Sequence, residues 1–258
     1  MRSPSRAAES RSPFAPGRDR LGIHWSSSQM SPKEAAAIAA ADLVPSDAVI
    51  GLGTGSTAEL FVRELGRRLE DGRVRKIVGV STSVRTATLA RELGVPLLPK
   101  HDVPEEIAIT FDGADEVDPA WNLTKGGGGS LLREKIVAQA SRRLVIMVDD
   151  SKLAPRLGAT FPLPIDVVPF GWTTHIPFLE RLGVQPQLRR LFDGEVFQTD
   201  EGNYVLDLDF RSRGGIEDPK ALHEQLLSRV GIVETGLFLG MATAVVVGRP
   251  SGAEQLTR

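Results

Sequence analysis

The stretch LTKGGGGSLLREK, residues 123 to 135, places Lys125 directly before four consecutive glycines and Glu134 nine positions after that lysine. A carboxylate can remove a proton from carbon, and an ammonium group can stabilise the negative charge that this creates. Bare glycine backbone can approach a bound molecule closely. Glu134 falls near the start of a predicted helix, where the helix dipole and a nearby lysine favour its ionised form. A merely flexible loop is the alternative.

An acidic cluster, DGADEVD at residues 112 to 118, follows an apolar run that predicts a buried strand. Asp112 and Asp115 can both face one pocket, and the small residues Gly113 and Ala114 leave space beside them. Neighbouring carboxylates near a lysine can acquire the separated pKa values that acid–base catalysis requires. The alternative is a solvated turn, which acidic clusters at strand ends often form.

The turn GLGTGST lies between a predicted strand and a predicted helix. N–H groups at a helix start favour anions, and the hydroxyls of Thr54, Ser56 and Thr57 add donors. The dinucleotide fingerprint G-x-G-x-x-G is not met, because Ser56 occupies its sixth position and the acid expected after the next strand is missing. A phosphate monoester therefore fits this turn better than NAD, and a tight structural turn is the alternative.

Strands that alternate with helices predict the frame that positions these turns. Apolar runs predict strands at residues 47–53, 74–80, 95–99, 107–117 and 143–150, and helical patterns occupy residues 31–44, 56–71, 83–94 and 130–141. In an open parallel sheet, ligands bind beyond the carboxyl ends of the strands. Lys152 and Lys33 offer further cations at that edge. We therefore expect an α/β fold with a Rossmann-like, mainly parallel sheet flanked by helices.

The sequence pattern changes near residue 155 and predicts a smaller second domain. Proline-punctuated FPLPIDVVPFGW and alternating GNYVLDLDF are followed by the helical DPKALHEQLLSRVG. We assign residues 156–231 to a small α+β (ferredoxin-like) domain. Residues 31–155 plus 232–258 form the α/β catalytic domain, to whose sheet GLF and TAVVVG return. Residues 1–30, rich in Arg, Ser and Pro, predict a disordered N-terminal extension, with a basic nucleic-acid or targeting arm as the alternative.

Composition narrows the classes of function. The chain has 258 residues, 25% of them charged, and a net charge of −2, which argues against nucleic acid or an anionic membrane as the main partner. No apolar stretch is long enough for a membrane helix, and residues 1–30 lack the apolar core of a secretory signal. The chain has no cysteine, and its four histidines are scattered, so we expect no transition-metal site. These features predict a soluble cytoplasmic protein.

From about Ser31 to its C-terminus, the chain closely resembles the type A family of ribose 5-phosphate isomerases. The resemblance rests on GLGTGST, DGADEVD, KGGGGSLLREK, DDSK and FPLPIDVVPF, which occur in the family's order and near its spacing. It implies interconversion of ribose 5-phosphate and ribulose 5-phosphate in the non-oxidative pentose phosphate pathway. It also implies a phosphorylated pentose as substrate, no metal or organic cofactor, and assembly as a homodimer or homotetramer.

The resemblance also implies roles for individual residues. Glu134 matches the family's proton-abstracting base, and Asp112, Asp115 and Lys125 match residues around the sugar's O1, O2 and ring oxygen. The other implied substrate-binding residues are Lys33, Thr54, Gly55, Ser56, Thr57, Gly113, Ala114, Gly126, Gly127, Gly128 and Lys152, with the two lysines of this set near the phosphate. Gly129 and Ser130 stand where the family often has other small residues, without changing the spacing from Lys125 to Glu134.

Three other functions share parts of this pattern. A non-catalytic sugar-phosphate sensor domain is the main alternative, although it would not need Glu134 beside Lys125, and no helix-turn-helix pattern precedes the first helix. An amino-sugar phosphate isomerase or deaminase would use the same aldose–ketose chemistry. A nicotinamide-dependent oxidoreductase is the third, and it would require binding of NAD(P)H.

Overall fold

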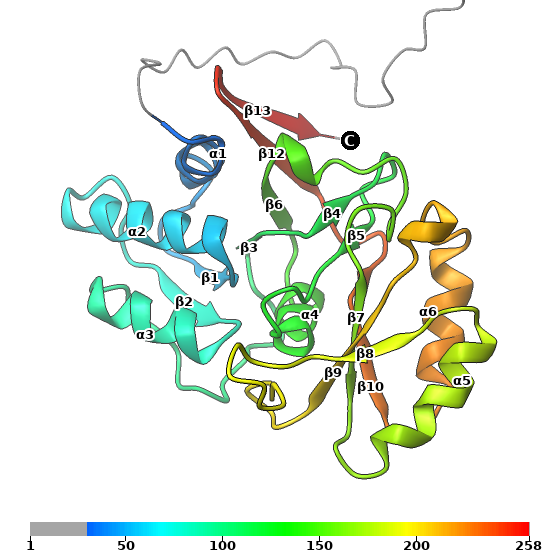
Figure 1. Ribbon diagram of the computed structural model, residues 1–258. Helices are drawn as coiled ribbons and strands as arrows, with labels where there is room; N and C mark the ends of the chain where they lie inside the picture. The colour runs from blue at the N-terminus through cyan, green and yellow to red at the C-terminus, as the bar shows by residue number, and fades with distance from the viewer. Residues whose placement is uncertain (1–29, 258) are drawn as a thin grey trace, which may run out of the picture.

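The computed structural model describes residues 30–257, and its largest feature is a six-stranded sheet (Figure 1). The strand order is β13 (Gly252–Thr257), β12 (Ala244–Arg249), β6 (Leu144–Asp149), β3 (Ile109–Asp112), β1 (Val49–Leu52) and β2 (Val78–Ser81). All neighbours are parallel except β12 and β13. The chain runs outward from β1 to β2 on one side and from β3 to β6 on the other. Such a switch point is where open α/β sheets bind ligands.

One face of this sheet is covered by α1 (Pro32–Ala41), α2 (Ser56–Glu70) and α3 (Val84–Glu92). Helix α1 begins with a capping box, in which Ser31 and Glu34 each accept a hydrogen bond from the other's backbone N–H. Its alanines allow close approach to the sheet. A Cβ added at Gly248 of β12 would lie 1.7 Å from the carbonyl oxygen of Pro32, so glycine is required where this helix crosses the strand.

The opposite face is covered by α4 (Leu131–Gln139) and a three-stranded sheet of β4 (Glu116–Val117), β5 (Leu123–Thr124) and β11 (Leu237–Phe238). Strand β6 contributes to both cores. Val145 and Met147 join the core beneath α1 and α2, whereas Leu144, Ile146 and Val148 join the core on the opposite face. A strand buried on both faces explains why this segment is apolar without alternation.

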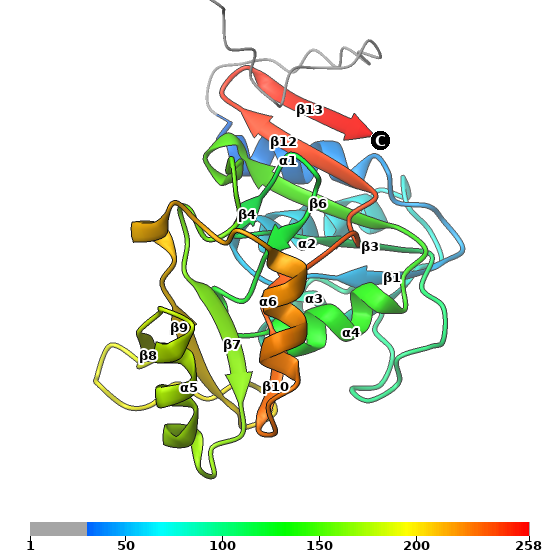
Figure 2. The same cartoon turned by 90° about the vertical axis from the view of Figure 1, so that its right-hand side faces the viewer.

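A second, antiparallel sheet lies beside the first, with the order β10 (Ile232–Thr235), β7 (Leu163–Val167), β9 (Tyr204–Leu208) and β8 (Pro186–Leu188). Helices α5 (Ile176–Arg181) and α6 (Pro219–Leu227) pack on it around a separate apolar core (Figure 2). The chain order β7-α5-β8-β9-α6-β10 with this strand order is the ferredoxin-like arrangement. Short 3₁₀ helices are η1 (Asp150–Lys152), η2 (Trp172–His175) and η3 (Arg211–Arg213).

The fold confirms the predicted mainly parallel α/β sheet with a smaller ferredoxin-like unit, but it differs in detail. Residues 232–235 form β10 and pair with β7, so the division into domains, which stays a proposal, is better placed after Thr235 than at residue 231. GLF does not return to the large sheet, because β11 pairs with β5. The strand expected at 95–99 is reduced to a bridge between Leu97 and Gly79.

Two expectations concern the ends and the surroundings of the chain. The extension expected for residues 1–30 lies, apart from Met30, outside the described residues. Within residues 30–257, no helix combines the length and the apolar character that crossing a membrane would take.

Candidate active site

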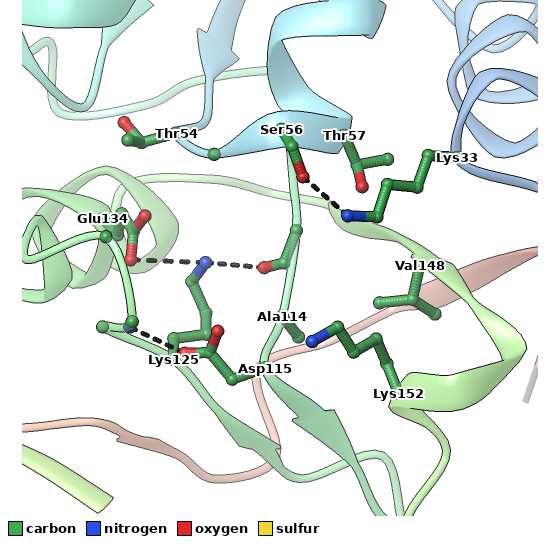
Figure 3. Close-up of a pocket in the computed structure, with 15 residues that line it drawn as sticks. Lys33, Thr54, Ser56, Thr57, Ala114, Asp115, Lys125, Glu134, Val148 and Lys152 are labelled. Carbon is green, nitrogen blue, oxygen red and sulfur yellow. Dashed lines mark hydrogen bonds and ion pairs between the residues drawn. The ribbon is translucent and has the colours of Figure 1, made fainter. Parts of the chain in front are cut away.

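The turns that follow the adjacent strands β1, β3 and β6 meet at one edge of the large sheet and enclose a pocket (Figure 3). The glycine-rich loop after β5 and the start of α4 close its other side. The lining residues are Lys33, Thr54, Gly55, Ser56, Thr57, Gly113, Ala114, Asp115, Lys125, Gly126, Gly127, Gly128, Glu134, Val148 and Lys152. Segments far apart in the sequence therefore converge here, and of the predicted site residues only Asp112 lies behind this lining.

Lys125 is the centre of a buried charge cluster. Its Nζ lies 3.1 Å from Oδ2 of Asp112 and 3.3 Å from Oε2 of Glu134, and it donates a 2.6 Å hydrogen bond to the carbonyl oxygen of Gly113. The three charged side chains are 2% to 5% exposed. Figure 3 shows the ammonium group pointing towards Glu134. Burial strengthens each of these interactions, because water no longer screens them.

Burial also decides the protonation of Glu134. Desolvation raises the pKa of Glu134 to about 8; Lys125 opposes this shift, and the charges of Asp112 and Asp115 add to it. Lys125 favours the ionised form, as expected, but the desolvation of the carboxylate outweighs this effect, so the net shift of the pKa of Glu134 is upward. A carboxylate with a pKa near neutrality is suited to accept a proton and to return it.

The ammonium of Lys125 responds in the opposite way. Burial by itself lowers the pKa of Lys125, but the negative charges of Asp112, Glu134 and Asp115 outweigh burial and raise that pKa above its usual range. Lys125 therefore stays protonated at the pH values at which Glu134 titrates. The pocket thus holds a permanent cation beside a carboxyl group that can gain or lose a proton.

The two predicted aspartates occupy different positions. Asp112 is buried and accepts hydrogen bonds from the backbone N–H of Thr54 at 3.1 Å and of Gly113 at 2.7 Å. Asp115 lines the pocket and accepts a 2.7 Å hydrogen bond from the N–H of Gly127. Burial raises the pKa of both carboxyl groups, against the opposing effects of Lys125 on Asp112 and of the Gly127 N–H on Asp115. Only Asp115 is therefore placed to touch a ligand directly.

The glycines of the loop differ in how strictly the structure requires them. Gly126 has a φ of +104°, which favours glycine. A Cβ at Gly127 would lie 2.6 Å from Oδ1 of Asp115, so a side chain there would displace the aspartate. At Gly128 an added Cβ would meet only a Thr54 methyl carbon at 3.8 Å. There is therefore open space beside Gly128, which lines the pocket.

The opposite end of the pocket is suited to an anion. Lys33 and Lys152 lie at this end, away from Lys125, and Lys33 donates a 2.9 Å hydrogen bond to the hydroxyl of Ser56 (Figure 3). Helix α2 begins at Ser56 without a side-chain cap, and Gly55 precedes it with a φ of +110°. Two cations and the free N–H groups at the start of a helix can hold a phosphate group.

Thr54 differs from the other hydroxyl residues of this turn. Its hydroxyl lies within hydrogen-bond distance of the side chains of Thr82 and Ser83, both at 2.8 Å, and of Thr86 at 3.2 Å. In Figure 3 the Thr54 side chain points away from Lys33. It thus links the turn to the start of α3, although Thr54 also lines the pocket.

Two features of the pocket were missed by reasoning from sequence. Val148 lines it from the end of β6, and it carried no signal because it belongs to an apolar run. Arg189 of the second sheet donates to the carbonyl oxygens of the glycine-rich loop from outside the pocket. Its position more than 60 residues along the chain from that loop gave no sequence signal either.

Comparison with known proteins agrees with this geometry. A family model described as ribose 5-phosphate isomerase A (phosphoriboisomerase A) matches residues 78–252. The ribose-5-phosphate isomerase A of Chloroflexus aurantiacus is 52% identical over 225 residues, which cover 87% of this chain and 92% of the relative. A solved D-ribose-5-phosphate isomerase in complex with phospho-erythronic acid is 36% identical, with a TM-score of 0.83, covering 88% of this chain and 98% of that one. The ribose 5-phosphate isomerase A of Methanocaldococcus jannaschii has a TM-score of 0.81 at the same identity and coverage.

Proposed function

This chain belongs to the ribose 5-phosphate isomerase A family, and from that membership we propose that it interconverts D-ribose 5-phosphate and D-ribulose 5-phosphate through an enediolate, with Glu134 as the base. The observation that carries the proposal is the ion pair between Glu134 and Lys125 within a pocket that Lys33 and Lys152 also line. A protein that only senses sugar phosphates would gain nothing from a buried carboxyl group with a pKa near 8.

Glu134 moves one proton between two carbon atoms of the open-chain sugar. Its ionised carboxylate takes the proton from C2 of the aldose, and the electrons of that C–H bond form the double bond of an enediolate. The same carboxyl group then returns the proton to C1, which gives the ketose without any change in oxidation state overall. Negative charge grows on the sugar oxygens during the first step, and the Lys125 ammonium with N–H groups of the glycine-rich loop stabilises it.

Asp115 and Asp112 have different roles in the proposed reaction. We assign ring opening and proton exchange between O1 and O2 to Asp115, because it lines the pocket and its pKa is raised by burial. Asp112 instead holds Lys125 in place, since it lies behind the lining and its oxygens face that ammonium and two backbone N–H groups. Asp112 is thus a positioning residue, and Asp115 is the one that contacts the sugar.

The phosphate group serves as an anchor. We place it at the start of α2, between Lys33 and Lys152, with the hydroxyls of Ser56 and Thr57 as further donors. The relative that was solved with phospho-erythronic acid, a phosphorylated four-carbon sugar acid, supports a ligand of this class. Binding energy from the anchored phosphate can then hold C1 and C2 against Glu134.

The same family membership supports the wider assignments. We propose a role in the non-oxidative pentose phosphate pathway, a cytoplasmic location and assembly as a homodimer or homotetramer. Sedimentation analysis of the purified protein would measure the assembly, and a monomer at micromolar concentration would contradict it.

The decisive test is a direct assay. Purified protein should convert ribose 5-phosphate into ribulose 5-phosphate with EDTA present and without any added cofactor. Glucosamine 6-phosphate serves as the comparison substrate for the amino-sugar alternative. Binding of ribose 5-phosphate without turnover would instead identify a sensor domain.

The pH dependence of the reaction should follow the ionisation of Glu134. Only the ionised carboxylate accepts a proton, so kcat/KM should rise with pH and level off above about 8, which is the pKa of Glu134. The raised pKa of Lys125 keeps this residue charged through the same range, so it should cause no decline there. The substrate phosphate titrates lower, at about 6. A kcat/KM that is flat between pH 6.5 and pH 9, values chosen to bracket these transitions, would contradict the assignment.

Lys152→Ala should weaken binding of phosphorylated pentoses far more than it affects a free pentose. Lys152 lies on the other side of the pocket from Glu134, where we place the phosphate (Figure 3). We expect KM for ribose 5-phosphate to rise by about tenfold or more, with a much smaller change in kcat, as the loss of a charge-assisted contact predicts. Steady-state kinetics with ribose 5-phosphate and ribose check this, and equal losses for the two sugars would exclude the placement.

A further inference from the structure

Arg189, which follows β8 in the second sheet, contacts the outer side of the glycine-rich loop. Its Nη1 donates to the carbonyl oxygen of Gly126 at 2.8 Å and to that of Gly127 at 3.2 Å. Its Nε and Nη2 donate to the two carboxylate oxygens of Asp207 on β9, so the guanidinium group is fixed from behind. The side chain is only 15% exposed. This arginine therefore links the second sheet to the loop that borders the active site.

The loop also has other close neighbours, because a Cβ at Gly126 would lie 2.7 Å from a side-chain carbon of Leu131 and 3.2 Å from one of Pro164. The N–H of Gly129 donates to the carbonyl oxygen of Gly126 at 2.9 Å, which closes a turn within the loop. Phe197 lies against the same turn, because a Cβ at Gly129 would come within 2.3 Å of the Phe197 ring. The guanidinium of Arg189 lies 5.8 Å from the centre of that ring. Between these contacts, consecutive glycines allow their peptide planes to rotate more freely than any other residues would.

The two carbonyl groups determine where two N–H groups point. In a planar trans peptide, the C=O and the N–H of one peptide unit point in opposite directions. The Gly126 carbonyl shares its peptide unit with the Gly127 N–H, which donates to Asp115 at 2.7 Å. The Gly127 carbonyl likewise shares its unit with the Gly128 N–H. Because both carbonyls accept from Nη1 of Arg189, both N–H groups point away from Arg189, and that of Gly127 reaches Asp115.

We propose that Arg189 is a positioning residue for the isomerase reaction: it locks the Gly126–Gly127 and Gly127–Gly128 peptide planes so that their N–H groups serve Asp115 and the substrate oxygens. The inference rests on the proposed function of this pocket. Donors held in place before the reaction stabilise growing negative charge without the cost of reorganising. The positive charge on the carbonyl side also polarises each peptide unit, which strengthens its N–H as a donor. The ferredoxin-like unit thus takes part in shaping the active site.

The test is Arg189→Ala, with Arg211→Ala as its matched control. Arg211 forms a similar two-point contact with Asp209 in the same part of the chain, but it is more exposed and lies apart from the glycine-rich loop. Arg189→Ala should lower kcat by about 10- to 100-fold, as the misplacement of an oxyanion donor predicts, while KM changes by less than about threefold. Phosphate anchorage is untouched, which is why KM should be preserved. Arg211→Ala should leave both constants unchanged.

Hydrogen exchange gives a readout that does not depend on activity. The Gly127 amide should exchange faster in Arg189→Ala than in the wild-type protein or in Arg211→Ala. Without Arg189, the peptide plane is no longer held so that the Gly127 N–H donates its hydrogen bond to Asp115. If Arg189→Ala does not fold, Asp207→Asn tests the same point, since it loosens the guanidinium group but keeps it present. That variant should show a smaller kcat loss of the same kind, again at nearly constant KM.

The outcomes separate this inference from the proposed function. Wild-type protein without isomerase activity would overturn the proposed function itself. An active wild type with unchanged kcat in folded Arg189→Ala, or with unchanged exchange at Gly127, would overturn the role of Arg189 alone. A loss confined to thermal stability, with normal turnover per folded molecule, would do the same.

Discussion

Glu134→Gln is expected to lower kcat by about 10²- to 10⁴-fold, the range for loss of a positioned general base. Glutamine has nearly the same shape and keeps a polar group near Lys125, but it cannot accept a proton from carbon. Because Glu134 is buried and its pKa is about 8, the neutral amide resembles the protonated acid that the fold already accommodates. The variant should therefore fold normally and bind ribose 5-phosphate with little loss. Stopped assays for kcat and calorimetry for binding measure the two effects separately.

Glu64→Gln provides the matched control for that variant. Glu64 is also a buried helical glutamate in an ion pair, with Arg68 at 2.8 Å, but it lies in α2 outside the pocket. Its replacement should leave kcat unchanged. Near-normal turnover in Glu134→Gln would remove Glu134 from the base role, and a loss of equal size in Glu64→Gln would show that the effect is not specific to the site.

Lys125→Met should reduce both catalysis and stability. Without the ammonium, the enediolate loses its nearest cation, and we expect kcat to fall by about 10²- to 10³-fold, as for removal of one oxyanion donor. The same change leaves Asp112 buried without its ion-pair partner at 3.1 Å, which typically costs about 3–5 kcal/mol in the free energy of unfolding. The pH profile should also move to higher pH, since Lys125 holds the pKa of Glu134 down. Kinetics across pH and urea unfolding measure these effects.

Lys135→Met separates the two parts of this prediction. Lys135 is also a buried lysine in an ion pair, with Glu234 at 2.7 Å, and it lies on the same helix as Glu134. It should lose stability in a similar way but retain much more of kcat, because it does not line the pocket. If Lys135→Met and Lys125→Met reduced kcat equally, the catalytic role of the Lys125 charge would be refuted.

Much of the fold could be predicted because its signals are local. Apolar runs and helical spacing predicted the alternating strands and helices, and the parallel sheet followed from their order along the chain. The elements that were misplaced are short, such as β11, the two-residue strand Leu237–Phe238. A strand of this length has no periodicity of its own, and only its partner decides which sheet it joins. In this fold the partner is β5.

Within the site, the acidic cluster also shows what local sequence signals cannot predict. The cluster contains four acids between residues 112 and 118, of which Asp112 and Asp115 are the predicted candidates for chemistry. In the fold, Glu116 is fully buried and accepts hydrogen bonds from Gly158, Thr160 and Phe161, so it orders a loop. Asp118 holds a turn through Ala120 and Asn122. Asp115, by contrast, lines the pocket, and Asp112 lies behind the lining in an ion pair with Lys125.

The sequence by itself determined the family, most of the order of strands and helices in the large sheet, and the turns that carry the candidate site residues, because these depend on residue types and on spacing along the chain. Only the tertiary structure decided that Glu134 has a raised pKa, since desolvation depends on what surrounds the carboxyl group in space. It also decided that Arg189 touches the loop at Gly126, because a contact made across two sheets leaves no pattern in the intervening sequence.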